Sequence, residues 1–117
     1  MIGDRVKVQF NQLNAGTSPI PIYQLKKDPT TGHPMVDESD GCYYPIFIGG
    51  VNPGSFGTIK NGPVKVIKQK LQGVEKHATL GVEYVPLYEV YFDYYKQTAW
   101  VFNDNMIIIG SDSALNY

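Results

Sequence analysis

Tyr88-Glu89-Val90-Tyr91-Phe92-Asp93 is the stretch with the clearest two-residue period in the chain. Successive side chains of a β-strand point to opposite faces of its sheet. The alternation therefore predicts a strand that buries Tyr88, Val90 and Phe92 and turns Tyr91 outward. A strand with one buried face is typical of an antiparallel sheet.

Similar patterns recur along the chain between turn-forming residues. We expect further strands at residues 5–10, 43–48, 57–60, 64–71, 98–102 and 106–109. No segment keeps a helical period over two turns. Residues 11–50 form one insertion, longer than the usual connection in a compact domain. From the strand parity we predict a common core that contains Val6, Val8, Ile59, Val90, Phe92 and Ile108.

The composition supports an all-β domain and gives no electrostatic signature. The chain has 117 residues, a length that fits one domain, and includes 12 glycines and 8 prolines. That many turn-forming residues fit short strands better than a helical bundle. The net charge is −1, so the total charge favours neither a polyanion nor a polycation as partner.

Five pieces of sequence, in this order, resemble an SH3-like barrel: Gly3-Asp4-Arg5-Val6-Lys7-Val8, Gly57-Thr58-Ile59, Tyr88–Asp93, Ala99-Trp100-Val101-Phe102 and Asn105–Ile109. The resemblance covers roughly residues 2–10 and 54–110. It implies one small five-stranded SH3-like barrel over residues 1–117, with the long insertion at about 11–50 after the first strand. The pattern is similar to KOW-type modules, to the small barrel subunit of photosystem I and to the variable chain of ferredoxin–thioredoxin reductase.

Catalytic and metal-binding residue types are few and scattered. His33 and His77 stand in separate polar segments, and Cys42 is the only cysteine. The acidic run at residues 37–41 lacks the spacing of a calcium-binding EF-hand loop and reads as a solvated turn. We therefore predict a protein that is not an enzyme, with no catalytic residue, no metal site and no cofactor.

Lysine is concentrated between residues 60 and 76, a stretch that contains five lysines and one acidic residue, Glu75. Exposed lysines commonly guard a sheet edge against pairing with other chains. The alternative is a phosphate-binding strand that uses Lys65, Lys68 and Lys70. The near-neutral total charge favours the first interpretation.

Four aromatic residues fall on adjoining parts of one predicted hairpin: Tyr91, Tyr94, Tyr95 and Trp100. Exposed tyrosine and tryptophan side chains are typical of contact surfaces. We expect the four rings to lie near one another and to form a binding surface. Equally, the insertion at 11–50 could fold back and cover them.

The sequence favours a non-catalytic interaction module or small accessory subunit that docks on a larger assembly, through a protein partner or self-association. One alternative is a KOW-like nucleic-acid-binding module. Another is an accessory subunit of an electron-transfer complex, as the photosystem resemblance implies. No basic segment followed by an apolar one opens the chain, and no aliphatic run approaches the length of a membrane helix. We therefore expect a cytoplasmic protein without membrane contact.

Overall fold

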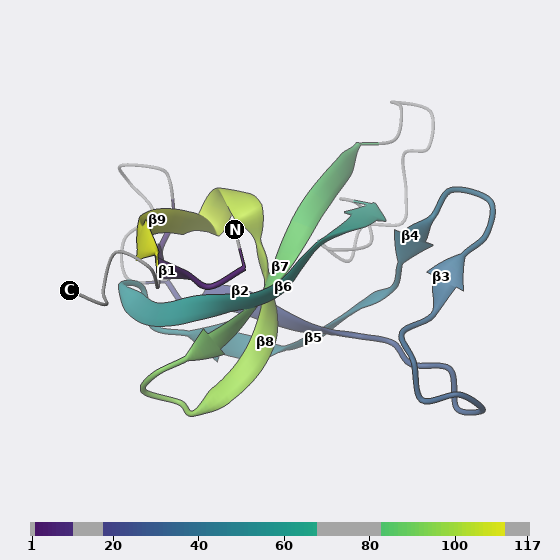
Figure 1. Ribbon diagram of the computed structural model, residues 1–117, viewed down its shortest axis with the longest axis horizontal. Coiled ribbons are helices and arrows are strands. Elements are labelled where there is room, and N and C mark those ends of the chain that lie inside the picture. The colour runs from purple at the N-terminus through teal and green to yellow at the C-terminus, as the bar shows by residue number, and fades with distance from the viewer. Residues whose placement is uncertain (1, 11–17, 68–82, 112–117) are drawn as a thin grey trace.

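The computed structural model describes residues 2–10, 18–67 and 83–111, which form strands and one short 3₁₀ helix (Figure 1). This confirms the all-β prediction. The elements in chain order are β1 (Asp4–Val8), β2 (Ile20–Leu25), β3 (Val36–Asp37), β4 (Cys42–Tyr43), β5 (Pro45–Val51), β6 (Ser55–Ile67), β7 (Tyr84–Phe92), β8 (Gln97–Phe102), the 3₁₀ helix η2 (Asn103–Asn105) and β9 (Met106–Ser111).

Seven of the strands form one antiparallel sheet in the order β5-β2-β8-β7-β6-β1-β9. β3 and β4 pair separately as a small hairpin. Figure 1 shows this hairpin at one end of the molecule, with β1 and β9 toward the other. Among the described strands, β5 and β9 are the edges of the seven-stranded sheet, and they do not pair with each other. The expected closed five-stranded barrel is therefore not confirmed.

The insertion contributes β2 and β5, which extend the sheet beyond β8. β2 pairs with β5 from Ile20 to Leu25, and it meets β8 where Tyr23 lies opposite Trp100. Pro45 begins the edge strand β5, a position where the missing N–H of proline costs no ladder hydrogen bond. The insertion is thus part of the sheet and lies directly beside Trp100.

β6 is one continuous strand, although the sequence predicted two strands separated by a turn at Asn61-Gly62-Pro63. Its pairing with β7 shifts twice, between Ile59 and Asn61 and again between Asn61 and Val64. Each shift places an extra residue on β6, as in a β-bulge. The turn-forming residues are therefore absorbed as bulges, and the strand continues to Ile67.

One apolar cluster fills one face of the sheet, and we call it the closed cluster. Its buried side chains come from β1, β2, β6, β7, β8 and the end of β5: Val6, Val8, Ile20, Ile22, Val51, Ile59, Val90, Phe92, Ala99 and Val101. Five of the six residues predicted to share a core belong to it. Tyr88, predicted to have core parity, packs against it while half-buried.

Ile108 was predicted to be in this core and is not, because its side chain remains 49% exposed. It lies in the edge strand β9, which pairs with β1 alone. The pairing of β9 with β1 shifts between Arg5 and Val6, opposite Gly110 and Ile108. Met106, not Ile108, packs against the closed cluster. Strand parity read from the sequence cannot anticipate such a shift inside an unbroken run of isoleucines.

Candidate functional site: a groove over Trp100

The outward face of the β7–β8 hairpin forms the floor of a groove. In the ladder of these two strands, Glu89 lies opposite Trp100, and Tyr91 lies opposite Thr98. Val90 and Ala99 alternate with these residues and point into the closed cluster. The alternation that builds the closed cluster on one face therefore presents Glu89, Thr98 and Trp100 on the other.

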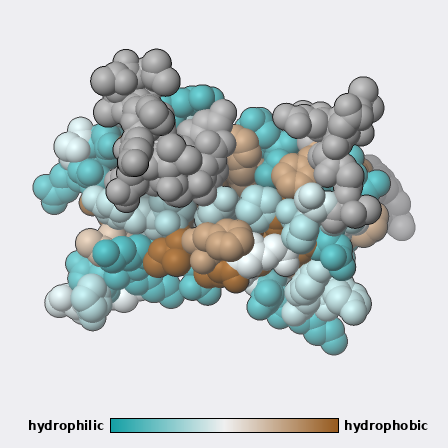
Figure 2. Space-filling model, turned by 180° about the vertical axis from the view of Figure 1, so that it is seen from behind, coloured by the Kyte–Doolittle hydropathy of each residue, from teal (hydrophilic) through white to brown (hydrophobic). Residues whose placement is uncertain are grey.

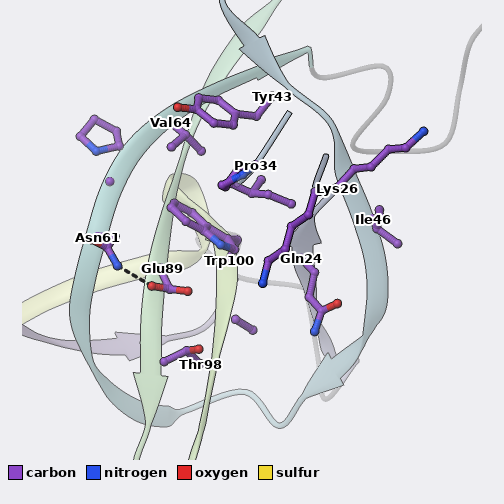
Figure 3. A pocket seen from close by; sticks show the side chains of 15 residues that line it. Gln24, Lys26, Pro34, Tyr43, Ile46, Asn61, Val64, Glu89, Thr98 and Trp100 are labelled. Carbon is purple, nitrogen blue, oxygen red and sulfur yellow. Dashed lines mark hydrogen bonds between the residues drawn. The ribbon is translucent and has the colours of Figure 1, made fainter. Parts of the chain in front are cut away.

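Two separate parts of the chain form the walls of the groove. The bulged segment of β6, from Asn61 to Val64, stands on one side. The end of β2, with Pro34 and Ile46 of the insertion, stands on the other, and Tyr43 lies beside Val64 (Figure 3). The enclosed volume is about 770 Å³. Figure 3 shows the indole of Trp100 in the middle of this groove, which we call the Trp100 groove.

A second apolar cluster supports the groove, and we call it the open cluster. Tyr23, Val66, Val85 and Leu87 are buried in it, and Tyr43, Val64, Trp100 and Phe102 pack against them while remaining partly exposed. Burial raises the pKa of the Tyr23 hydroxyl, so this tyrosine stays neutral at physiological pH. The open cluster lies on the face of β7 opposite to the closed cluster, since Leu87 and Val90 differ in parity.

The polar groups of the groove lie at its floor and at both walls. Asn61 Nδ2 donates a hydrogen bond of 2.6 Å to Glu89 Oε1 (Figure 3). This bond joins the bulge of β6 to β7 and fixes the carboxylate. Lys26 and Lys27 line the opposite wall, where β2 ends. Both lysines are exposed, so the groove combines an aromatic floor with a cationic wall.

Exposed apolar side chains occur along both edge strands. Ile46, Phe47 and Ile48 of β5 are exposed, as are Ile107, Ile108 and Ile109 of β9. The view from behind shows apolar surface gathered across the middle of the molecule, between hydrophilic regions (Figure 2). Neither strand contains a charged residue, although charges are the usual protection of an exposed edge.

The four aromatic residues predicted to form one surface occupy two places. Tyr94 and Tyr95 lie in the β7–β8 turn with ring centroids 5.2 Å apart, and Tyr94 is 84% exposed. The Tyr95 ring contacts Phe92 and packs on the closed cluster. Tyr91 and Trp100 lie at diagonal positions on the groove face. The prediction that all four rings lie together is therefore wrong, because the turn carries Tyr95 to the other face of the sheet.

The second predicted set, the lysines, is only partly described. Lys65 is exposed on β6, with its Nζ 4.7 Å from the centroid of the Tyr84 ring, a cation–π contact. Lys68 and Lys70 lie outside the described residues, as does His77. Beyond Thr58, β6 pairs with β7 but not with β1. Lys65 therefore points outward from a stretch with one hydrogen-bonded neighbour, an arrangement in keeping with a guarded edge.

The residue types associated with catalysis differ in their burial. Cys42 is buried in β4, with 2% of its surface exposed, whereas His33 is exposed in the hairpin that joins β2 to β3. Within residues 2–10, 18–67 and 83–111, no three histidine, cysteine or acidic side chains are arranged to hold a metal ion.

The acidic run at residues 37–41 forms a turn, as predicted. Asp37 Oδ1 accepts hydrogen bonds from the Ser39 N–H at 2.9 Å and from the Ser39 hydroxyl at 2.6 Å. Asp40 Oδ1 accepts one from the Cys42 N–H at 2.9 Å. Such bonds, donated to an aspartate by the backbone N–H two residues later, define an Asx-turn. The carboxylates of Asp37 and Asp40 thus shape the β3–β4 connection.

In this groove the insertion, the bulged strand β6 and a predicted binding residue line one cavity. Sequence reasoning identified Trp100 but missed Lys26, Lys27, Tyr43 and Glu89, since their proximity depends on pairing between distant segments. No helix in the described ranges is long and apolar enough to cross a membrane. No protein-family model, curated protein or solved structure matches this chain.

Proposed function

We propose that this protein is a non-catalytic interaction module that binds an extended segment of a partner protein in the Trp100 groove. The observation that carries the proposal is a partly exposed tryptophan at the floor of a concave site of about 770 Å³. Recognition pockets commonly have volumes of this order.

Trp100 has the properties of an interface anchor. Tryptophan is enriched among the residues whose truncation costs the most binding energy, especially where neighbours exclude water. Here Tyr43 and Val64 flank the groove as part of the same cluster. Contact with an apolar partner side chain would remove the rest of the indole from water, at about 25 cal/mol for each Å² buried.

We further propose that β9, β1, β6, β7 and β8 are an SH3-like barrel held open by the inserted strands. The support is their adjacency in that order within the sheet and the 3₁₀ helix Asn103–Asn105 immediately before the last strand. Asn105–Ile109, which starts at the end of this helix, is the last of the five pieces of sequence that resemble such a barrel. Such barrels serve many unrelated functions, so the proposed activity rests on the groove and not on the fold.

The test is selection of binding peptides from a random display library, followed by measurement against two matched variants. Thr98→Tyr places a ring on the groove floor, at an exposed position that lines the cavity. Gln97→Tyr adds the same ring one residue earlier, where the side chain points to the other face of the strand. Both positions are exposed, so neither change should impair folding.

We expect Thr98→Tyr to lower peptide affinity at least tenfold and Gln97→Tyr to leave it unchanged. A tenfold loss corresponds to about 1.4 kcal/mol. Selection of no peptide, or equal effects of the two variants, would contradict the proposed role of the groove.

A further inference from the structure

The Trp100 groove has an excess of positive charge at one wall. Lys26 and Lys27 line it at the end of β2, and Glu89 is the acidic side chain among its lining residues. Within the described part of the chain, no ion pair involves either lysine. Glu89 lies across the groove, where Asn61 already holds one of its oxygens. The wall of β2 is therefore a cationic surface with no described counter-charge.

On this basis we propose that the partner segment is an acidic peptide, with an apolar side chain against Trp100 and an aspartate or glutamate beside Lys26 and Lys27. The inference rests on the proposed function and names the chemistry of its ligand. The arrangement of charges also gives the ligand a direction. A carboxylate near Glu89 would be repelled, whereas one at the wall where β2 ends would be attracted by the lysine charge there.

The charge pattern favours an acidic peptide over single-stranded nucleic acid. A nucleic acid strand carries a charge at every nucleotide and is normally bound along a continuous basic track. The groove offers two lysines at one wall, and the carboxylate of Glu89 lies on its floor. The exposed Lys65 contacts the ring of Tyr84 and does not line the groove. A peptide with one acidic group beside one apolar side chain fits a groove that has lysines at one wall and an indole in its middle.

Trp100 makes the inference measurable, because it is the only tryptophan in the chain. Its fluorescence therefore reports on occupancy of the groove without labelling. Peptides selected from the random library are titrated into the protein while the emission is followed. Each selected peptide is compared with a version in which every aspartate and glutamate is replaced by its amide.

The variant that tests the cationic wall is the double substitution Lys26→Gln and Lys27→Gln. Its matched control is Lys60→Gln with Lys65→Gln, which removes two exposed lysines of β6 that do not line the groove. Both doubles change the net charge equally, so a difference between them reports on position rather than on total charge. None of the four lysines is buried.

We expect the selected peptides to be enriched in acidic residues and to shift the Trp100 emission. The Lys26/Lys27 double variant should bind them about three- to tenfold more weakly, as expected for two solvent-exposed charge pairs. The amide peptides should lose the same factor, the control variant should match the original protein, and added salt should reduce the difference.

Three results would overturn the inference. Peptides that bind at Trp100 without acidic residues, and equally well to the Lys26/Lys27 variant, would reject the acidic ligand but leave the proposed function standing. Tighter binding of oligothymidylate than of any selected peptide, with a shift in Trp100 emission, would identify a nucleic-acid site instead. Selection of no peptide at all would reject both the inference and the proposed function.

Discussion

The closed and open clusters use opposite faces of the same β7–β8 hairpin, yet one is sealed and the other is not. Val90 and Phe92 have no exposed surface in the closed cluster. Trp100 and Tyr43 pack on the open cluster but remain partly exposed. In the first case strands from the whole sheet surround the apolar side chains. In the second, the insertion and the bulged β6 leave a groove between them.

This difference separates a surface that stabilises the fold from one available for binding. Apolar side chains that neighbours already cover contribute to the free energy of folding. Those that neighbours leave partly uncovered can contribute again when a ligand arrives. Substitutions in the closed cluster should therefore affect stability first, and substitutions on the groove floor should affect binding first.

The largest effect is expected for Phe92→Ala in the closed cluster. Phe92 is fully buried, and truncation of a buried phenylalanine costs about 3–5 kcal/mol, the lost transfer energy plus that of the cavity. Trp100→Ala should cost about 2 kcal/mol or less, since part of the indole is already in water. Urea denaturation followed by circular dichroism measures both. Equal losses would remove the distinction between the two clusters.

A smaller effect sharpens the comparison within the closed cluster itself. Val90→Ala should lower the free energy of unfolding by about 1–3 kcal/mol, because Val90 is fully buried. Ile108→Ala should cost under about 1 kcal/mol, since half of that side chain is exposed. The same denaturation experiment checks the pair. A greater loss of unfolding free energy for Ile108→Ala than for Val90→Ala would show that Ile108 is buried in the core, as its strand parity predicted.

The smallest effect concerns the ion pair between β1 and the residue after β7, where Arg5 contacts Asp93 through two hydrogen bonds, of 3.0 and 2.5 Å. The hydrogen bond from Arg5 lowers the pKa of Asp93 below its ordinary value of 3.8. The pair therefore adds stability above pH 3.8, and this contribution is lost as the pH falls through the lower pKa of the folded state.

Asp93→Asn should accordingly flatten the acid limb of the stability curve below about pH 4. The Asp93 side chain is 47% exposed, so the effect near neutral pH should stay under about 1 kcal/mol. Thermal unfolding across a pH series measures it. If the acid limb of the variant matches that of the original protein, the ion pair makes no contribution in solution.

The sequence predicted the closed cluster well, because alternation on β1 and β7 is a local property. Val6, Val8, Val90 and Phe92 needed no knowledge of distant segments. The open cluster was not predicted, since Leu87 has the opposite parity to Val90 on β7 and two bulges in β6 place Val66 on the same face as Leu87. Bulges of this kind have only weak local signals, here the Asn61-Gly62-Pro63 run that resembled a turn.

The same reason explains which residues of the groove could be predicted from the sequence. Trp100 could be identified from its residue type and its place in the predicted hairpin. Lys26, Tyr43 and Ile46 could not, because their place in the wall depends on how the insertion pairs with β8 and packs beside β6. A long insertion without a clear period leaves that pairing open in the sequence.

The central claim is that binding takes place on the groove face of the β7–β8 hairpin and not at its turn. The most direct measurement is a two-dimensional ¹H–¹⁵N NMR titration of the protein with a selected peptide. We predict shifts of the Trp100 indole N–H and of the backbone amides of Thr98, Glu89 and Lys26, with the amides of Tyr94 and Tyr95 unmoved. Shifts confined to Tyr94, Tyr95 and Lys96, with the indole signal unchanged, would contradict the account.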